Sequence, residues 1–110
     1  MANTFFRKFS ANIGTTSTTL GSYTVGANTT SIVLGLTISN TTGSSINASV
    51  LVNNDANVYF LVKNAPIASG GALIPIGGDQ KLVLQFNDNV KIASDTATSI
   101  DAYMSIMEIT

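Results

Sequence analysis

The sequence predicts an all-β protein: an antiparallel β-sandwich, jelly-roll or immunoglobulin-like, with an extended N-terminal arm. Apolar residues alternate at period two in several short runs, turn residues separate these runs, and helix formers never gather at helical spacing over a long window. Short strands with turns roughly every 8–12 residues are typical of sandwiches and barrels. A length of 110 residues suits one domain.

The first 30 residues differ from the rest, because they are rich in Thr, Ser, Asn and Gly and hold two weak strand signals, at 5–9 and 20–25. Ordering about ten residues costs on the order of 10–15 kcal/mol. Burial of three Phe side chains would contribute a stabilising free energy of similar size. We therefore expect residues 1–30 to be an extended arm and residues 31–110 to be the sandwich domain.

Two alternating runs follow, at 31–39 and 46–52, with a Thr/Gly/Ser-rich turn at 40–45 between them. This arrangement predicts a hairpin. Leu34 is expected on the inward face of the first strand. The proposed inward residues of that strand are Ile32, Leu34, Leu36 and Ile38.

The middle of the chain predicts three further strands. Residues 58–63 form a more continuously apolar strand, 81–86 form an alternating one with Leu84 in the core, and 90–93 form a short one. Two prolines and two glycine pairs lie between the first two of these. Since proline cannot donate to a central ladder, that region is expected at a sheet edge or in a connection. The residues concerned are Pro66, Gly70, Gly71, Pro75, Gly77 and Gly78.

The last predicted strand, residues 100–109, is apolar on both faces. A strand covered on both faces is central or meets a partner. One face has Ile100, Ala102, Met104 and Ile106, and the other has Tyr103, Met107 and Ile109.

Residues able to perform chemistry are scarce. The chain has no His and no Cys, and no serine lies in a Gly-x-Ser-x-Gly elbow. Most acidic residues are flanked by turn residues, where Asp caps local backbone groups. Two clusters, 53–57 and 87–89, each offer one carboxylate, which is fewer than calcium sites usually need. We expect no enzyme activity, no cofactor and no metal.

The N-terminal cluster Phe5, Phe6, Arg7, Lys8 and Phe9 is the candidate partner-binding site. It places three aromatic rings and two cations in five residues. Docking onto another protein is the preferred interpretation, because buried aromatic anchors dominate interfaces. A strand of the protein's own sheet and a site for single-stranded nucleic acid are the alternatives.

Composition indicates a protein that works by contact. Charged residues make up only 10% of the chain and the net charge is −1, so little repulsion keeps copies apart and no overall field attracts nucleic acid. We expect a homo-oligomer, with a trimer as one option. No apolar run is long enough for a membrane helix, and no signal peptide is recognisable. Synthesis in the cytoplasm is therefore expected, without a membrane partner.

Three segments carry a resemblance to a known class: 33–40, 81–84 with the proline–glycine loop before it, and 100–109. Over most of residues 32–109 the chain resembles small β-sandwich structural proteins of tailed-bacteriophage virions, particularly cyanophages. The resemblance implies a non-enzymatic virion protein, first of all a capsid decoration (cement) protein. Its partners would be the major capsid protein or the neck and tail subunits. A neck or tail component and a carbohydrate-binding module are the alternatives, although the lack of Trp disfavours the latter.

Overall fold

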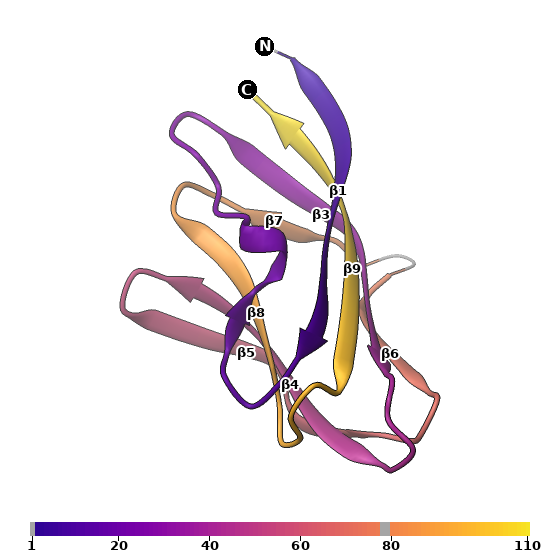
Figure 1. Ribbon diagram of the computed structural model, residues 1–110. Coiled ribbons are helices and arrows are strands. Elements are labelled where there is room, and N and C mark those ends of the chain that lie inside the picture. Colours follow the sequence, from indigo (N-terminus) through magenta and orange to yellow (C-terminus); the bar gives the residue numbers. More distant parts are fainter. Residues whose placement is uncertain (1, 78–79) are drawn as a thin grey trace.

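The computed structural model describes residues 2–77 and 80–110. Two antiparallel sheets face each other as a sandwich (Figure 1), which confirms the all-β prediction. The elements are β1 (Asn3–Ile13), β2 (Thr18–Thr19), the 3₁₀ turn η1 (Leu20–Ser22), β3 (Thr30–Asn40), β4 (Ile46–Asn54), β5 (Asn57–Ile67), β6 (Ala72–Ile76), β7 (Leu82–Leu84), β8 (Asp88–Ser94) and β9 (Ile100–Ile109).

The strand order shows how the chain is divided between the sheets. The first sheet has the order β1-β9-β3-β6, with β7 also paired to β3, and the second has the order β2-β8-β4-β5. The hairpin expected from residues 31–39 and 46–52 is therefore wrong, because β3 and β4 lie in different sheets. Both strands direct apolar residues into the same core from opposite sides, so their apolar faces meet across the sandwich instead of along a ladder.

The connection between these sheets is organised by the buried side chain of Asn40. Its Nδ2 donates to the carbonyl oxygens of Ser44 and Ile67 at 2.8 and 3.0 Å. Its Oδ1 accepts from the Thr42 N–H at 2.9 Å. These bonds give the chain a fixed corner at the point where the sequence pattern predicts a simple turn.

The core lies between the sheets and is supplied by alternate residues of the long strands. The inward face of β9 is buried as expected, and β9 is central, since it pairs with β1 on one side and β3 on the other. Leu84 is also fully buried, as expected. The most deeply buried large side chains are Leu20, Leu36, Ile38, Ile76, Leu84, Ile92, Ile100, Met104 and Ile106.

The inward face expected for β3 is only half correct. The β3–β9 register shifts between Val33 and Gly35. Val33 is buried before this irregularity and Leu36 after it, so the period-two pattern changes phase. Leu34 consequently lies on the outer face, half-buried, and its expected place in the core is wrong.

The extended arm expected over residues 1–30 is not confirmed. β1 pairs with β9 from Asn3↔Ile109 to Ile13↔Ile100. Beyond the strand, Ala2 and Thr110 exchange two backbone hydrogen bonds of 3.0 Å. Further along, Leu20, Tyr23 and Val25 are buried in the core. The described part of this segment is thus built into the sandwich. For residues 5–9 the structure shows the alternative interpretation, a strand of the protein's own sheet.

The proline-containing region lies at the sheet edges, as expected. Pro66 belongs to β5, the edge of the second sheet, and Pro75 belongs to β6, an edge of the first. Gly70, between these strands, adopts a φ of +70°, a conformation suited to glycine. The second glycine of the turn expected at Gly77 and Gly78 lies outside the described residues.

Candidate docking face

The N-terminal cluster is divided between the two sides of β1, since successive side chains of a strand point to opposite faces. Phe5 and Phe9 are 69% and 58% exposed on the outer face of the first sheet, with Arg7 between them. Phe6 packs against the core, and Lys8 is half-buried. The five residues therefore do not form one site.

The inward half of the cluster contributes to the fold. The rings of Phe6 and Tyr23 meet edge to face with their centroids 5.6 Å apart. Lys8 Nζ lies 5.8 and 5.9 Å from the centroids of these two rings. A Cβ on Gly21, whose φ is +59°, would lie 2.6 Å from the Lys8 Cβ. The close approach of η1 to β1 thus requires a glycine at this position.

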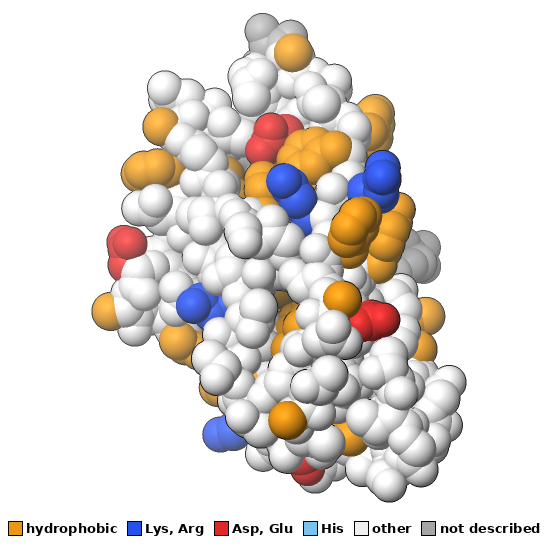
Figure 2. Space-filling model, in the orientation of Figure 1, with side chains coloured by type: hydrophobic (Ala, Val, Ile, Leu, Met, Phe, Trp, Pro, Cys, Tyr) orange, Lys and Arg blue, Asp and Glu red, His pale blue; other side chains and the backbone are white. Residues whose placement is uncertain are grey.

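The outer half of the cluster is joined by a residue from β9. Phe9 and Tyr103 are directly paired across β1 and β9, and their rings stack at 6.2 Å between centroids with 20° between planes. The Arg7 guanidinium carbon lies 5.6 Å from the Phe9 centroid. Among the described residues, the Arg7 guanidinium therefore lies over a ring face and forms no ion pair with a carboxylate. Figure 2 shows basic side chains next to hydrophobic ones on an otherwise largely uncharged surface.

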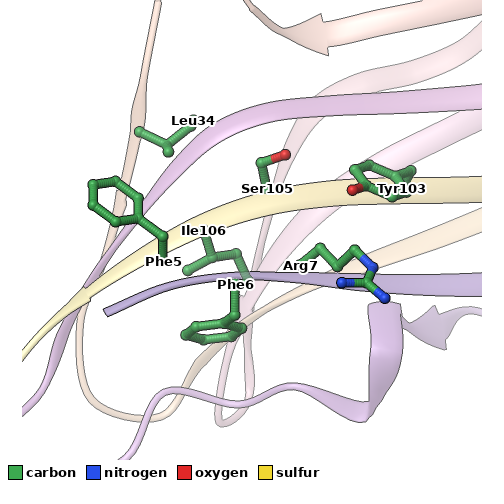
Figure 3. Close-up of a pocket in the computed structure, with 7 residues that line it drawn as sticks. All are labelled: Phe5, Phe6, Arg7, Leu34, Tyr103, Ser105 and Ile106. Carbon is green, nitrogen blue, oxygen red and sulfur yellow. The ribbon is translucent and has the colours of Figure 1, made fainter. Parts of the chain in front are cut away.

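A shallow hollow of about 290 Å³ opens beside these rings (Figure 3). The hollow lies where two neighbouring strands have small residues: Ser105 of β9 is paired with Gly35 of β3 on one side. On its other side Ser105 is paired with Arg7 of β1. Phe5 and Leu34 lie on one side of the hollow and Tyr103 on the other, while Phe6 points away. Phe5, Arg7, Phe9, Leu34, Tyr103 and Ser105 are called the aromatic face below.

Sequence reasoning found three residues of the aromatic face and missed three. Phe5, Arg7 and Phe9 belong to the cluster singled out from the sequence. Tyr103 could have been found from its place on the second apolar face of residues 100–109. Leu34 and Ser105 could not, since their positions depend on the irregularity in β3 and on the pairing of β1 with β9.

The buried polar groups serve the fold. The Tyr23 hydroxyl hydrogen-bonds to Ser31 Oγ and donates to Glu108 Oε2 at 2.5 Å. Burial, together with the hydrogen bond to Glu108, raises the pKa of Tyr23 to about 12. The phenol therefore stays protonated near neutral pH and acts as a hydrogen-bond donor. Sequence reasoning missed this network, whose members are 8 and 85 residues from Tyr23.

Asp88, Asp95 and Asp101 accept hydrogen bonds from backbone, amide or hydroxyl donors. Asp88 accepts from Asn54 Nδ2 at 2.6 Å and from the Gln85 N–H at 2.9 Å. Asp95 accepts from the Asn47 N–H and from Thr96 Oγ1, and these bonds lower its pKa. Asp101 accepts from the Asn12 N–H at 3.1 Å.

The structure brings the two Asn/Asp clusters, 53–57 and 87–89, side by side across β4 and β8. Among residues 2–77 and 80–110, no three His, Cys, Asp or Glu side chains gather as metal ligands. No helix in the same residues is long and apolar enough to span a bilayer. The arrangement that stands out is therefore the aromatic face, which suits contact with another molecule.

No protein-family model matches the chain, and no curated protein matches it in sequence.

Proposed function

We propose that the chain is a non-enzymatic structural subunit that binds another protein through the aromatic face. The observation that carries this proposal is the set of exposed rings around Arg7, with Phe5 69%, Phe9 58% and Tyr103 48% exposed. Contiguous exposed apolar patches commonly mark surfaces that bind another molecule. Tyr and Arg are enriched among the residues that dominate binding energy.

The partner surface is expected to combine apolar pockets with an acidic group. Phe5 and Tyr103 border the hollow and would fill pockets on the partner. Arg7 lies over the Phe9 ring, and its charge is available for a carboxylate of the partner. Because Arg7 is exposed, its charge is expected to affect the association rate and the salt dependence of binding.

The resemblance of residues 32–109 to virion proteins supports a place for this contact in a tailed-phage particle. Capsid decoration is the first choice, with the major capsid protein as partner, and a neck or tail position is the alternative. Imaging of labelled protein on whole virions separates these alternatives, since label would be spread over the head in the first case and confined to one vertex or to the tail in the second.

The test compares binding of variants to virions that lack the protein. Phe5→Ala and Tyr103→Ala are expected to weaken binding at least tenfold, since truncation of a central aromatic residue commonly costs about 2 kcal/mol or more. The matched control is Phe86→Ala, which removes a ring that is 54% exposed outside the aromatic face. Equal binding by Phe5→Ala, Tyr103→Ala and Phe86→Ala would contradict the proposal.

A carbohydrate-binding face is the rival from another class. The nearly parallel rings of Phe9 and Tyr103 favour it, because exposed rings can stack under sugars. A glycan array decides between the two. Binding that is lost in Tyr103→Ala would support the carbohydrate alternative, and silence of the array together with virion binding would support the structural subunit.

A further inference from the structure

The hollow of the aromatic face has apolar walls and a cation at one end. Phe5 and Leu34 border it on one side and Tyr103 on the other (Figure 3). Ser105 lies between these walls, in the middle strand of the three that carry the hollow. Arg7 is paired with Ser105 and lines the same hollow from β1. The hollow therefore crosses the strands of the first sheet and ends at a guanidinium.

The fold does not require the glycine at position 35, which lies beside Ser105 on the same face. Its φ is not positive, and a Cβ here would lie 3.7 Å from its nearest atom, the carbonyl oxygen of Ile76, which is an ordinary contact. The extra residue of the β3 irregularity is Leu34, since Gly35 itself is paired with Ser105. Glycine weakens a strand interior and often marks a place where another backbone comes close. The low floor of the hollow thus suits a bound chain.

The dimensions of the hollow suit an extended chain and exclude a helix. Phe5 and Phe9 lie in β1 on either side of Arg7, which places their Cα atoms about 13 Å apart. Their side chains and Tyr103 narrow this gap, whereas a helix with its side chains is about 10–12 Å across. In the other direction β1, β9 and β3 together span about 10 Å, the length of about three extended residues.

We propose that the hollow binds a short extended segment of the partner, in which a carboxylate lies next to an apolar side chain. This inference rests on the proposed function and specifies what the aromatic face recognises. The backbone of the segment would lie over Ser105 and Gly35, and its apolar side chain would lie between Phe5 and Tyr103. Its carboxylate would pair with Arg7 at the β1 end.

Charge complementarity is the reason for choosing an acidic segment as the occupant. Arg7 is exposed, lies over the Phe9 ring, and forms no ion pair within the part of the chain that the structure describes. A guanidinium can hold a carboxylate through parallel N–H···O bonds, which would fix the direction of the bound segment. The Ser105 hydroxyl can donate to or accept from the backbone of the same segment. A basic or wholly apolar segment would leave Arg7 without a partner.

Gly35→Val tests the proposal, because it fills the floor of the hollow and removes no side chain. Valine suits a strand, so the melting temperature should not fall below that of the wild type. Binding to virions that lack the protein should nevertheless weaken at least tenfold. The matched control is Gly43→Val, at a glycine whose Cβ would have no atom within 4 Å, and it should bind like the wild type. Ser105→Val fills the same floor from β9 and should also weaken binding, which keeps the test decisive if Gly35→Val does not fold.

Two further measurements test the acidic character of the segment. Arg7→Gln should weaken virion binding and make it less dependent on salt, whereas Arg7→Lys should keep the salt dependence, since it retains the charge. A photoreactive p-benzoylphenylalanine in place of Leu34, at the wall of the hollow, should crosslink on the virion to a partner segment that has Asp or Glu next to a bulky apolar residue.

The outcomes separate this inference from the proposed function. Failure of the wild type to bind virions overturns both. Normal binding by folded Gly35→Val and Ser105→Val, together with loss of binding in Phe5→Ala and Tyr103→Ala, overturns the inference alone, because the face would then dock without a segment in the hollow. A crosslinked segment without Asp or Glu overturns it too, as does a crosslink only to a second copy of this chain.

Discussion

Tyr23 shows how this chain uses polar groups at the scale of single residues. Its hydroxyl joins Ser31 of β3 to Glu108 of β9, while its ring packs edge to face on Phe6. Tyr23 thereby connects the segment after η1 to three strands of the first sheet, β1, β3 and β9. Buried polar groups that lose a partner cost about 1–3 kcal/mol, so this position should be sensitive to loss of the hydroxyl alone.

Tyr23→Phe is expected to lower the free energy of unfolding by about 1–3 kcal/mol near neutral pH, since Ser31 and Glu108 lose a buried partner. The difference should shrink at high pH. Burial raises the pKa of Tyr23 to about 12, whereas an unfolded tyrosine titrates near 10. The stability that Tyr23 contributes is therefore complete below about pH 10 and is lost by about pH 12, a change of about 2–3 kcal/mol.

Urea unfolding of wild type and Tyr23→Phe at pH 8 and pH 12 measures this change. Tyr103→Phe is the control, because Tyr103 is 48% exposed and removal of its hydroxyl should leave the free energy of unfolding nearly unchanged. An equal difference between wild type and Tyr23→Phe at both pH values would contradict the role assigned to the buried phenol.

Single residues also show where sequence reasoning stops. The face of β9 could be read from alternation, because β9 pairs with β3 and β1 over its whole length and its inward residues are buried. The same reasoning placed Leu34 in the core, although it lies on the outer face. A one-residue irregularity reverses every later side chain, and nothing in an alternating run of apolar residues marks where it occurs.

At the scale of elements, β1 has two roles. Its inward side chains, Phe6 and Lys8, pack beside Tyr23, and its outward side chains, Phe5 and Phe9, belong to the aromatic face. The energy balance drawn from the sequence treated this segment as free-standing. It left out the ladder with β9, which satisfies the backbone of β1 from Asn3 to Ile13.

Deletion of residues 2–10 is accordingly expected to destabilise the sandwich and not merely to remove a docking segment. The free energy of unfolding in urea should fall by about 2 kcal/mol or more, since Phe6 leaves the core and one edge of β9 loses its partner. The control is Phe5→Ala/Phe9→Ala, which removes two exposed rings and keeps the strand. A deletion variant that melts like wild type would mean that β1 is a detachable arm after all.

Strand identity was easier to predict than strand pairing. The bounds of β9 coincide with the predicted run at 100–109, and β3 to β5 lie close to their predicted positions. The partners of β3 and β4 were wrong, because alternation shows that a strand has an apolar face and does not show which sheet contains it. The corner at Asn40 depends on carbonyl groups up to 27 residues away, which a local pattern does not reveal.

At the scale of the whole molecule, exposed apolar side chains lie on both sheets. The molecule is elongated, with extents of 46 × 29 × 21 Å. The aromatic face belongs to the first sheet, and the β5 edge belongs to the second.

We propose, as the main functional hypothesis, that this chain works by docking its aromatic face on a protein of a phage particle. A cryo-electron microscopy reconstruction of the virion with this protein in place tests the claim most directly. Phe5, Arg7 and Tyr103 are expected to be covered by a neighbouring protein that offers apolar pockets and a carboxylate. A reconstruction in which these three side chains face solvent while the chain is held by other surfaces would contradict it, as would a virion that does not contain the chain.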